Sequence, residues 1–307
     1  MLKKVLLGIV TVVLLVFLGI GNYLYDYSLN PKNISSEVLA QDDDDTVKYE
    51  KEEENKKWFL ENDEKIYGTS VTGAKIVAHR FMQKEKTDKY VIMVHGYGSS
   101  AYYVSIYIKL FYDLGYNVLA PDLLGFGDSE GDVISMGGFD SVDLAMWANR
   151  IVEEDPNAKI VISGMSMGAA TVLNSLNKNL PDNVKAFIDD SGYLVLKEQM
   201  AYQLKKLFKL PSFPILDFAS LVTRIRGGYF ISYVDAREGL KNTNLKGLIL
   251  HGDIDSFVPI KNSERVYELL KNKEMHVFKD TKHVQAIRKY NDEYREIIKK
   301  FLKENLR

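Results

Sequence analysis

The chain has 307 residues, 46% of them hydrophobic, and a formal net charge of −2, and its length is enough for one large globular domain or two small ones. A charge this close to zero provides no general attraction to nucleic acid, so no nucleic-acid partner is expected. The absence of Cys excludes disulfides, Cys-ligated zinc, a Cys nucleophile and a lipidated N-terminal Cys.

An uncharged apolar run, Val5 to Tyr25, follows Lys3 and Lys4 at the N-terminus. As a helix it would span about 30 Å, which is the hydrocarbon thickness of a bilayer. The nearest small-x-small cleavage site, Gly19 to Gly21, is followed by bulky residues, so residues 1–25 are predicted to be an uncleaved signal-anchor. Lysines beside a membrane helix usually stay on the cytoplasmic side, so the rest of the chain would lie on the other side. We therefore expect a single-pass protein of the cell membrane with its catalytic domain outside. The alternative is secretion after signal cleavage.

Residues 26–64 are interpreted as an acidic connector, a solvated spacer that includes Asp42 to Asp45. The run from 65 to 307 then alternates between apolar segments and helical patterns, which predicts a mainly parallel central sheet with helices on both faces. The expected strands are Lys65–Tyr67 and Lys75–Phe81, paired as a hairpin, then Tyr90–Val94, Asn117–Ala120, Ile160–Ile162, Val184–Ile188, Leu245–Leu250 and Glu274–Phe278. The expected helices are Tyr102–Leu114, Phe139–Glu154, a helix ending at Leu180, Ile260–Lys271 and Ala286–Leu302.

The segment Gly164-Met165-Ser166-Met167-Gly168 lies between a predicted strand and a predicted helix. A tight strand–turn–helix with Ser at its apex is the arrangement of a nucleophile elbow, so Ser166 is the predicted nucleophile. Gly at both flanking positions lets the neighbouring backbone come close. A second G-x-S-x-G, at Gly127 to Gly131, has charged residues beside its Ser and no helical run after it, so it is interpreted as a surface loop.

A Ser nucleophile needs a general base, and that base needs an acid partner. Among five His, His283 follows the last predicted strand, so its loop reaches the same sheet edge as Ser166 and it is the predicted base. His251 also fits this rule, but it precedes a Gly at a strand end and is interpreted as shaping a turn. The loop after the preceding strand offers Asp253 and Asp255 as the acid, with Asp189 and Asp190 in reserve. Backbone N–H groups of Met167 and Tyr97 are the predicted oxyanion donors, the latter from the loop His95-Gly96-Tyr97-Gly98.

These residues make the chain similar to α/β-hydrolases of the serine esterase, lipase and aminopeptidase type, in particular to small signal-anchored bacterial members. The resemblance covers about residues 65–302 and rests on H-G-Y-G, D-x-x-G-x-G-x-S-x-G, G-M-S-M-G, G-x-x-D-x-x-V-P and a terminal K-H. It implies an α/β-hydrolase fold, places the acid at Asp255, and identifies residues 193–236, where the alternation breaks, as a helical cap over the site. Met165 stands where many members have His.

The resulting hypothesis is hydrolysis of carboxylic esters of small-molecule or acyl substrates through Ser166, His283 and Asp255, with no metal or organic cofactor. A peptidase or acyltransferase with the same triad, or a non-catalytic binding protein, is the alternative. The cap segment Tyr193–Phe230 has six basic and two acidic residues among many apolar ones. Its apolar side chains either pack the cap onto the sheet or line an acyl pocket whose basic face steers anionic or interfacial substrates.

Overall fold

The computed structural model describes residues 1–34 and 51–306, so the acidic run Asp42–Asp45 lies outside the described residues. The strands are β1 (Glu64–Thr69), β2 (Lys75–Phe81), β3 (Lys89–Val94), β4 (Asn117–Pro121), β5 (Lys159–Met165), β6 (Val184–Asp190), β7 (Lys246–Gly252) and β8 (Lys273–Phe278). They form one sheet in the order β1-β2-β4-β3-β5-β6-β7-β8. β3 to β8 are parallel, whereas β2 is antiparallel to β1 and β4, so the predicted mainly parallel sheet and its initial hairpin are confirmed.

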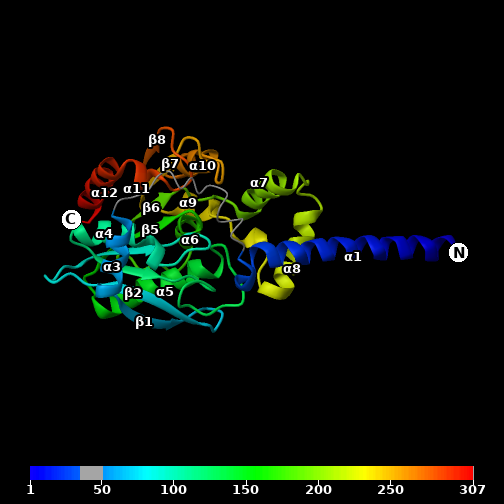
Figure 1. The fold of residues 1–307 in the computed structure, drawn as a ribbon, viewed down its shortest axis with the longest axis horizontal. Helices are drawn as coiled ribbons and strands as arrows, with labels where there is room; N and C mark the ends of the chain where they lie inside the picture. Colours follow the sequence, from blue (N-terminus) through cyan, green and yellow to red (C-terminus); the bar gives the residue numbers. More distant parts are fainter. Residues whose placement is uncertain (35–50, 307) are drawn as a thin grey trace.

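Helices cover both faces of this sheet (Figure 1). They are α3 (Glu52–Asn62), α4 (Ser105–Asp113), α5 (Phe139–Glu154), α6 (Met167–Ser175), α9 (Arg237–Asn242), α10 (Lys261–Leu269), α11 (Ala286–Lys289) and α12 (Asn291–Asn305), with a 3₁₀ turn η2 (Tyr102–Val104) before α4. Trp147 of α5 and Val172 of α6 pack in the apolar core on one face, and Phe111 of α4 and Tyr294 of α12 pack in the core on the other. The strands read as continuous apolar runs because both of their faces are buried.

The predicted closing helix is divided at Tyr290, whose backbone has φ −123° and ψ 47°. The Tyr290 hydroxyl donates to the Lys279 carbonyl at 3.0 Å, and its ring stacks on Phe278. These tertiary contacts hold Tyr290 out of helical geometry, although the apolar spacing of the sequence is continuous across it.

The insertion between β6 and β7 contains α7 (Leu196–Phe208), α8 (Ile215–Gly227) and the 3₁₀ turn η3 (Ile231–Tyr233). Its two ends meet at a narrow base, where Val195 and Asp235 form an antiparallel bridge. The Leu196 N–H donates to the Val234 carbonyl at 3.0 Å, and the Ala236 N–H donates to the Leu194 carbonyl at 3.1 Å. The insertion therefore leaves and rejoins the sheet domain at one place.

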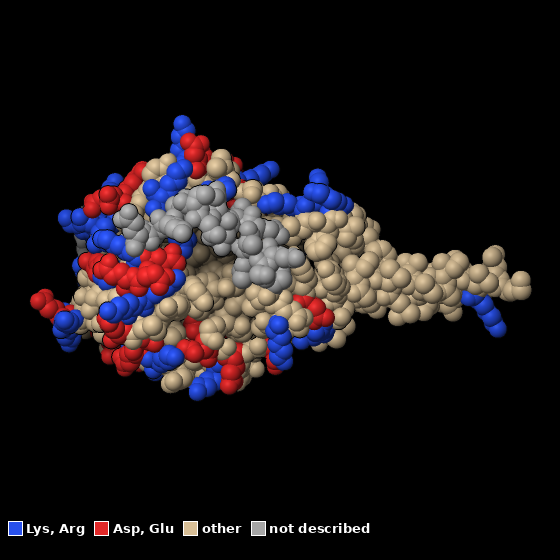
Figure 2. All heavy atoms as spheres, viewed as in Figure 1, with Lys and Arg blue, Asp and Glu red and all other residues tan. Residues whose placement is uncertain are grey.

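The N-terminal helix α1 (Leu2–Ser28) projects from the body of the protein, and the turn η1 (Pro31–Asn33) follows it (Figure 1). Residues 1–16 are all exposed, and Figure 2 shows this part without acidic residues and with basic residues only near its free end. Its other end is packed into the protein, where Tyr25 is 3% exposed and Leu29 is 1% exposed. By length and composition, α1 is the one helix among the described residues able to cross a membrane.

Candidate active site

Ser166 lies at the sharp turn between β5 and α6, with φ 53° and ψ −119°. Positive φ is strained for a residue with a side chain, and such strain is concentrated at functional sites. A Cβ at Gly164 would lie 2.4 Å from the Gly168 carbonyl group, and a Cβ at Gly168 would lie 2.2 Å from the Val94 oxygen. The two flanking glycines are therefore required by close backbone contacts, as the sequence pattern predicts.

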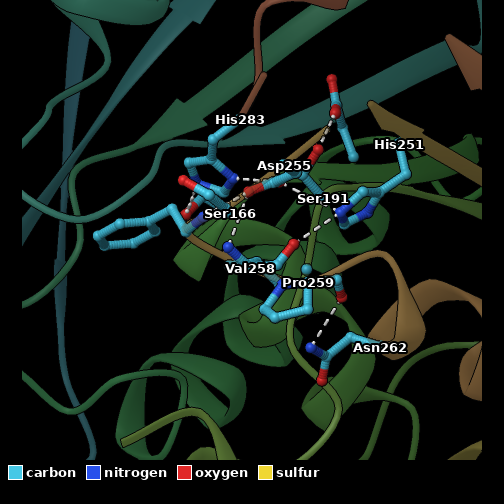
Figure 3. A network of polar contacts seen from close by, with 12 residues as sticks. Ser166, Ser191, His251, Asp255, Val258, Pro259, Asn262 and His283 are labelled. Carbon is cyan, nitrogen blue, oxygen red and sulfur yellow. Dashed lines mark hydrogen bonds and ion pairs between the residues drawn. The ribbon is translucent and has the colours of Figure 1, made fainter. Parts of the chain in front are cut away.

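Ser166, His283 and Asp255 form one chain of hydrogen bonds (Figure 3). The Ser166 Oγ contacts His283 Nε2 at 2.8 Å, and His283 Nδ1 contacts Asp255 Oδ2 at 2.7 Å. The three side chains lie beyond the carboxyl ends of β5, β8 and β7, the edge at which ligands bind in open α/β sheets. The structure thus brings together all three residues predicted for the triad.

Asp255 is held as an anion by its surroundings. Burial alone would raise its pKa, but the charge of His283 and the hydrogen bonds from His251 and His283 outweigh burial and hold the pKa well below its ordinary range. Its other oxygen accepts the N–H groups of Phe257 and Val258, each at 2.8 Å. A carboxylate can only accept, so His283 must donate from Nδ1 and present the lone pair of Nε2 to the Ser166 hydroxyl.

His251 is a residue whose role the sequence analysis does not predict. It is fully buried, and its Nε2 lies 2.8 Å from the Val258 carbonyl and 3.1 Å from Asp255 Oδ2. Both partners are acceptors, so Nε2 carries the proton, while Nδ1 contacts the Ser263 hydroxyl at 2.7 Å. His251 therefore supports the loop that carries Asp255 (the acid loop). The sequence feature that could have indicated this role is the position of His251 at the end of β7, four residues before Asp255.

The other candidate carboxylates have different partners. Asp253 accepts the Thr281 N–H at 3.2 Å and so joins the acid loop to the loop of His283. Asp190 accepts from the hydroxyls of Tyr107 and Tyr294 beneath the site. Asp189 accepts the Gly192 N–H, and burial raises its pKa to about 7. Among the described contacts, none of these three carboxylates reaches His283.

The second G-x-S-x-G lies in a surface loop, as predicted, with Gly127, Asp128 and Glu130 exposed, but Ser129 itself is only 8% exposed. Its hydroxyl donates to the Asp122 carbonyl at 2.7 Å and accepts the Val77 N–H at 2.8 Å. The Asp122 carboxylate in turn accepts the N–H groups of Ala101 and Asp128. This motif therefore ties loops together at the edge of the sheet, and its Ser is occupied by structural hydrogen bonds.

The remaining histidines have structural partners. His79 lies between Asp63 at 2.9 Å and Asp122 at 3.1 Å. Burial lowers the His79 pKa, but the two carboxylates outweigh burial and raise it to about 9. With Asp122 and Asp128, His79 forms the one group with metal-ligand spacing among the described residues. Both nitrogens of its ring already contact carboxylates, so the ring has no free lone pair for a cation and these residues do not fit one.

His95 and His276 are also outside the triad. His95 is fully buried, and its Nε2 accepts the Leu123 N–H at 3.0 Å, so it supports the loop after β3. His276 is paired with Glu293 at 3.0 Å. His283 is thus the one histidine with a described contact to a Ser at a strained turn.

Two predicted oxyanion donors lie beside Ser166. A Cβ at Gly96 would lie 3.4 Å from Ser166 Cβ, so the backbone that leads to Tyr97 passes directly next to the nucleophile. Met167 is the first residue of α6, where N–H groups are free of intrahelical partners and the helix dipole is positive. Tyr97 and Met167 line the same cavity as Ser166.

That cavity has about 960 Å³ of empty space, which includes open solvent at its mouth. None of the residues that line it is charged. They are Leu24, Tyr25, Tyr27, Ser28, Leu29, Tyr97, Met136, Ser166, Met167, Tyr193, Leu196, Gln199, Met200, Gln203, Leu204, Leu207, Phe208, Leu216, Ala219, Thr223, Ile231 and Phe257. The cap and the N-terminal helix therefore both contribute walls.

Helix α7 is attached to the acid loop by one face. The side-chain amides of Gln199 and Gln203 each donate to the Phe257 carbonyl at 2.8 Å. Tyr202 and Lys206 donate to the Ser256 carbonyl. These four positions follow the i, i+3, i+4, i+7 spacing of one helical face, so the cap and the loop of the acid partner are held as one unit.

Comparison with known proteins agrees with this architecture. Residues 85–216 match the family described as serine aminopeptidase, S33. The Bacillus subtilis (strain 168) protein YqkD is 28% identical over 238 residues, 77% of this chain and 76% of that protein. Escherichia coli (strain K12) YfhR is 24% identical over 269 residues, 80% of this chain and 86% of that protein.

Among solved structures, the Pyrococcus furiosus esterase Pf2001 superposes with a TM-score of 0.65 at 24% identity, covering 80% of this chain and 93% of the esterase. The chain therefore has the fold of the α/β-hydrolase superfamily, and its predicted similarity to esterases and serine aminopeptidases is confirmed.

Proposed function

We propose that the protein hydrolyses carboxylic esters with Ser166 as nucleophile, His283 as general base and acid, and Asp255 as the residue that orients His283. The observation that carries this proposal is the hydrogen-bonded chain of these three side chains, with Ser166 in the wall of an uncharged cavity. The strained backbone of Ser166 and the anionic state of Asp255 support it.

The chemistry follows from the donor and acceptor roles. Ser166 Oγ attacks the ester carbonyl carbon while its proton passes to His283 Nε2, and the carbonyl oxygen becomes an oxyanion near the N–H groups of Tyr97 and Met167. The bond to the alcohol then breaks as His283 returns the proton to the leaving oxygen. Water, deprotonated by His283, attacks the acyl-enzyme and releases the acid and free Ser166. No step requires a metal or organic cofactor.

The composition of the cavity favours esters over amino-terminal peptide substrates. An aminopeptidase must bind a charged α-amino group, for which a carboxylate is the strongest partner. The residues that line the cavity include no Asp or Glu. A peptidase remains the alternative because of the family match, and an acyltransferase would use the same acyl-enzyme.

We also propose that residues 1–25 anchor the protein in the cell membrane, that 26–64 connect the anchor to the catalytic domain at 65–307, and that this domain lies outside the cytoplasm. The packing of Phe17 and Tyr25 against the body supports retention of the helix, since signal cleavage would remove these contacts. Protease treatment of intact cells tests this orientation. Protection of the domain until lysis would contradict it, and a secreted form that starts near residue 25 would indicate cleavage.

The test of the reaction compares p-nitrophenyl esters with aminoacyl-p-nitroanilides, using the full chain in detergent. We expect ester turnover and little anilide turnover. A fluorophosphonate probe should label the wild type and not Ser166→Ala, which separates an enzyme from a binding protein. Faster anilide turnover would establish a peptidase, and absence of both labelling and turnover would refute the proposed chemistry.

A further inference from the structure

The helix predicted as a membrane anchor also forms part of the candidate catalytic pocket. Leu24, Tyr25, Tyr27, Ser28 and Leu29 line the same cavity as Ser166. Leu24 and Ser28 are four residues apart and therefore lie on one face of α1. The last turns of α1 are thus positioned to contact a substrate, which an anchor that only tethers the domain would not require.

The position of α1 against the cap is fixed by specific contacts. Phe17 stacks on Phe218 of α8 with ring centroids 5.2 Å apart. A Cβ at Gly21 would lie 3.0 Å from the Phe218 carbonyl group, so the two helices are in backbone contact at this point. Farther along, Arg226 of α8 contacts Asp26 at 2.7 Å and lies over the Tyr25 ring. α8 therefore runs beside α1 in the same direction, and its first turns lie nearest the projecting part.

The length of the projecting part places the cap at the level of the membrane. The exposed apolar segment Val5–Val16 has twelve residues and spans about 18 Å as a helix. The hydrocarbon core of a bilayer is about 30 Å thick, so about 12 Å, or roughly eight further residues, must also be immersed. Those residues are Phe17–Leu24, which pack against the cap. The edge of the cap and the pocket wall at Leu24 then lie in the outer leaflet.

The surface of the cap has the composition that this location requires. Phe213 is 77% exposed and Ile225 is 72% exposed, and Leu210 and Leu221 are also exposed. Basic residues lie near them on the same two helices and the loop between: Lys205, Lys206, Lys209, Arg224 and Arg226. Apolar side chains mixed with Lys and Arg are typical of a surface that sits at the headgroup level of a bilayer.

The walls of the pocket are mostly apolar, and none of the residues that line it is charged. Such walls fit the acyl chain of a substrate.

We propose that the substrate is a membrane-resident acyl ester and that α1 forms one wall of its acyl pocket. The substrate enters from the outer leaflet with its acyl chain between α1 and the cap. This proposal rests on the ester hydrolysis proposed above. It predicts that changes in α1 alter acyl-chain selectivity while the reactivity of Ser166 stays unchanged.

The first experiment uses a pair of glycine variants in the full chain, reconstituted in phospholipid nanodiscs. Gly21→Leu forces α1 away from α8, whereas Gly19→Leu is the matched control because a Cβ there has no neighbour within 4 Å. Loss of contact with two methylene groups, at about 0.8 kcal/mol each, should lower kcat/KM for p-nitrophenyl decanoate about tenfold in Gly21→Leu. Turnover of p-nitrophenyl acetate and fluorophosphonate labelling should match the wild type in both variants.

A second variant keeps the helix contacts and fills the pocket instead. Ser28→Phe should shift the best substrate to a shorter acyl chain, whereas Val16→Phe, on the exposed part of α1, should leave it unchanged. Equal chain-length profiles for wild type, Gly21→Leu and Ser28→Phe would overturn the role of α1. If the wild type neither hydrolyses acetate nor reacts with the fluorophosphonate, the proposed chemistry fails first, so the two failures are distinguishable.

Discussion

The carboxyl edge of the sheet and the assembly of α1 with the cap bound the same cavity, but they are held together by different interactions. At the sheet edge, Ser166, His283 and Asp255 are fixed by short hydrogen bonds and a strained backbone. At the cap, α1 and α8 meet mainly through ring stacking and a glycine contact, with one exposed ion pair. Directional bonds set the geometry of the reacting atoms, whereas apolar contacts set the shape of the space beside them.

The strongest test of this difference removes the nucleophile. Ser166→Ala should lower turnover by about 10⁶, because no other described hydroxyl is hydrogen-bonded to His283. Ser129→Ala, in the other G-x-S-x-G, should retain most of the activity, since Ser129 bonds Asp122 and Val77 instead. Initial rates on one p-nitrophenyl ester measure both. An equal loss of turnover in a folded Ser129→Ala variant would contradict the assignment of Ser166 as the nucleophile.

The next test changes the orienting acid without changing its size. Asp255→Asn should lower turnover by about 10⁴, because an amide at this position permits the wrong tautomer of His283. Asp253→Asn is the matched control, since the amide oxygen can still accept the Thr281 N–H. Rates for Asp255→Asn equal to those of the wild type would send the search for the acid to Asp190.

His79 lies outside the catalytic triad, so its titration should change the free energy of unfolding and not the catalytic rate. The pKa of His79 is raised from 6.5 to about 9, so its ion pairs stabilise the fold fully below pH 6.5 and are lost as the pH rises through 9. This shift corresponds to about 3 kcal/mol of unfolding free energy. The thermal midpoint should therefore fall by about 5 °C or more between pH 6.5 and pH 10.

His79→Gln is the control for this prediction, because a neutral side chain has no such titration. Its thermal midpoint should be lower at pH 6.5 and should lose the part of the pH dependence that comes from His79. Ester turnover per folded molecule should not change. A wild-type midpoint that is identical at the two pH values would contradict the ion pairs.

The smallest effect is expected at the ion pair between α1 and the cap. Arg226→Gln removes the contact with Asp26, which is partly exposed and is worth about 1 kcal/mol or less. The ratio of decanoate to acetate turnover should fall by less than about fivefold, well below the effect of Gly21→Leu. A larger loss would mean that polar contacts, rather than apolar packing, hold the pocket wall.

The two regions also differ in how far the sequence predicts them. Ser166, His283 and Asp255 each follow a strand within a few residues, so local patterns and the direction of parallel strands locate them. The contact between Arg226 and Asp26 joins residues 200 positions apart, and no local pattern indicates it. The sequence indicated a membrane helix and an apolar cap separately, but not that they share a wall.

Other features could not be predicted locally because they depend on tertiary contacts. Ser129 is buried since Asp122 draws the surrounding loop onto the sheet, although its neighbours are charged. The division of the last helix at Tyr290 depends on a carbonyl eleven residues away. His251 has an ordinary turn position in the sequence, and only the fold shows that its ring supports Asp255.

The narrow base of the cap has a consequence for the history of such proteins. Because Val195 and Asp235 are paired, a segment between them can change in length without altering the spacing of β6 and β7. Insertions are tolerated where chain ends are close together at a surface. Recombination at this base could replace the cap as a cassette, and substrate range would then diverge among descendants while the chemistry stays the same.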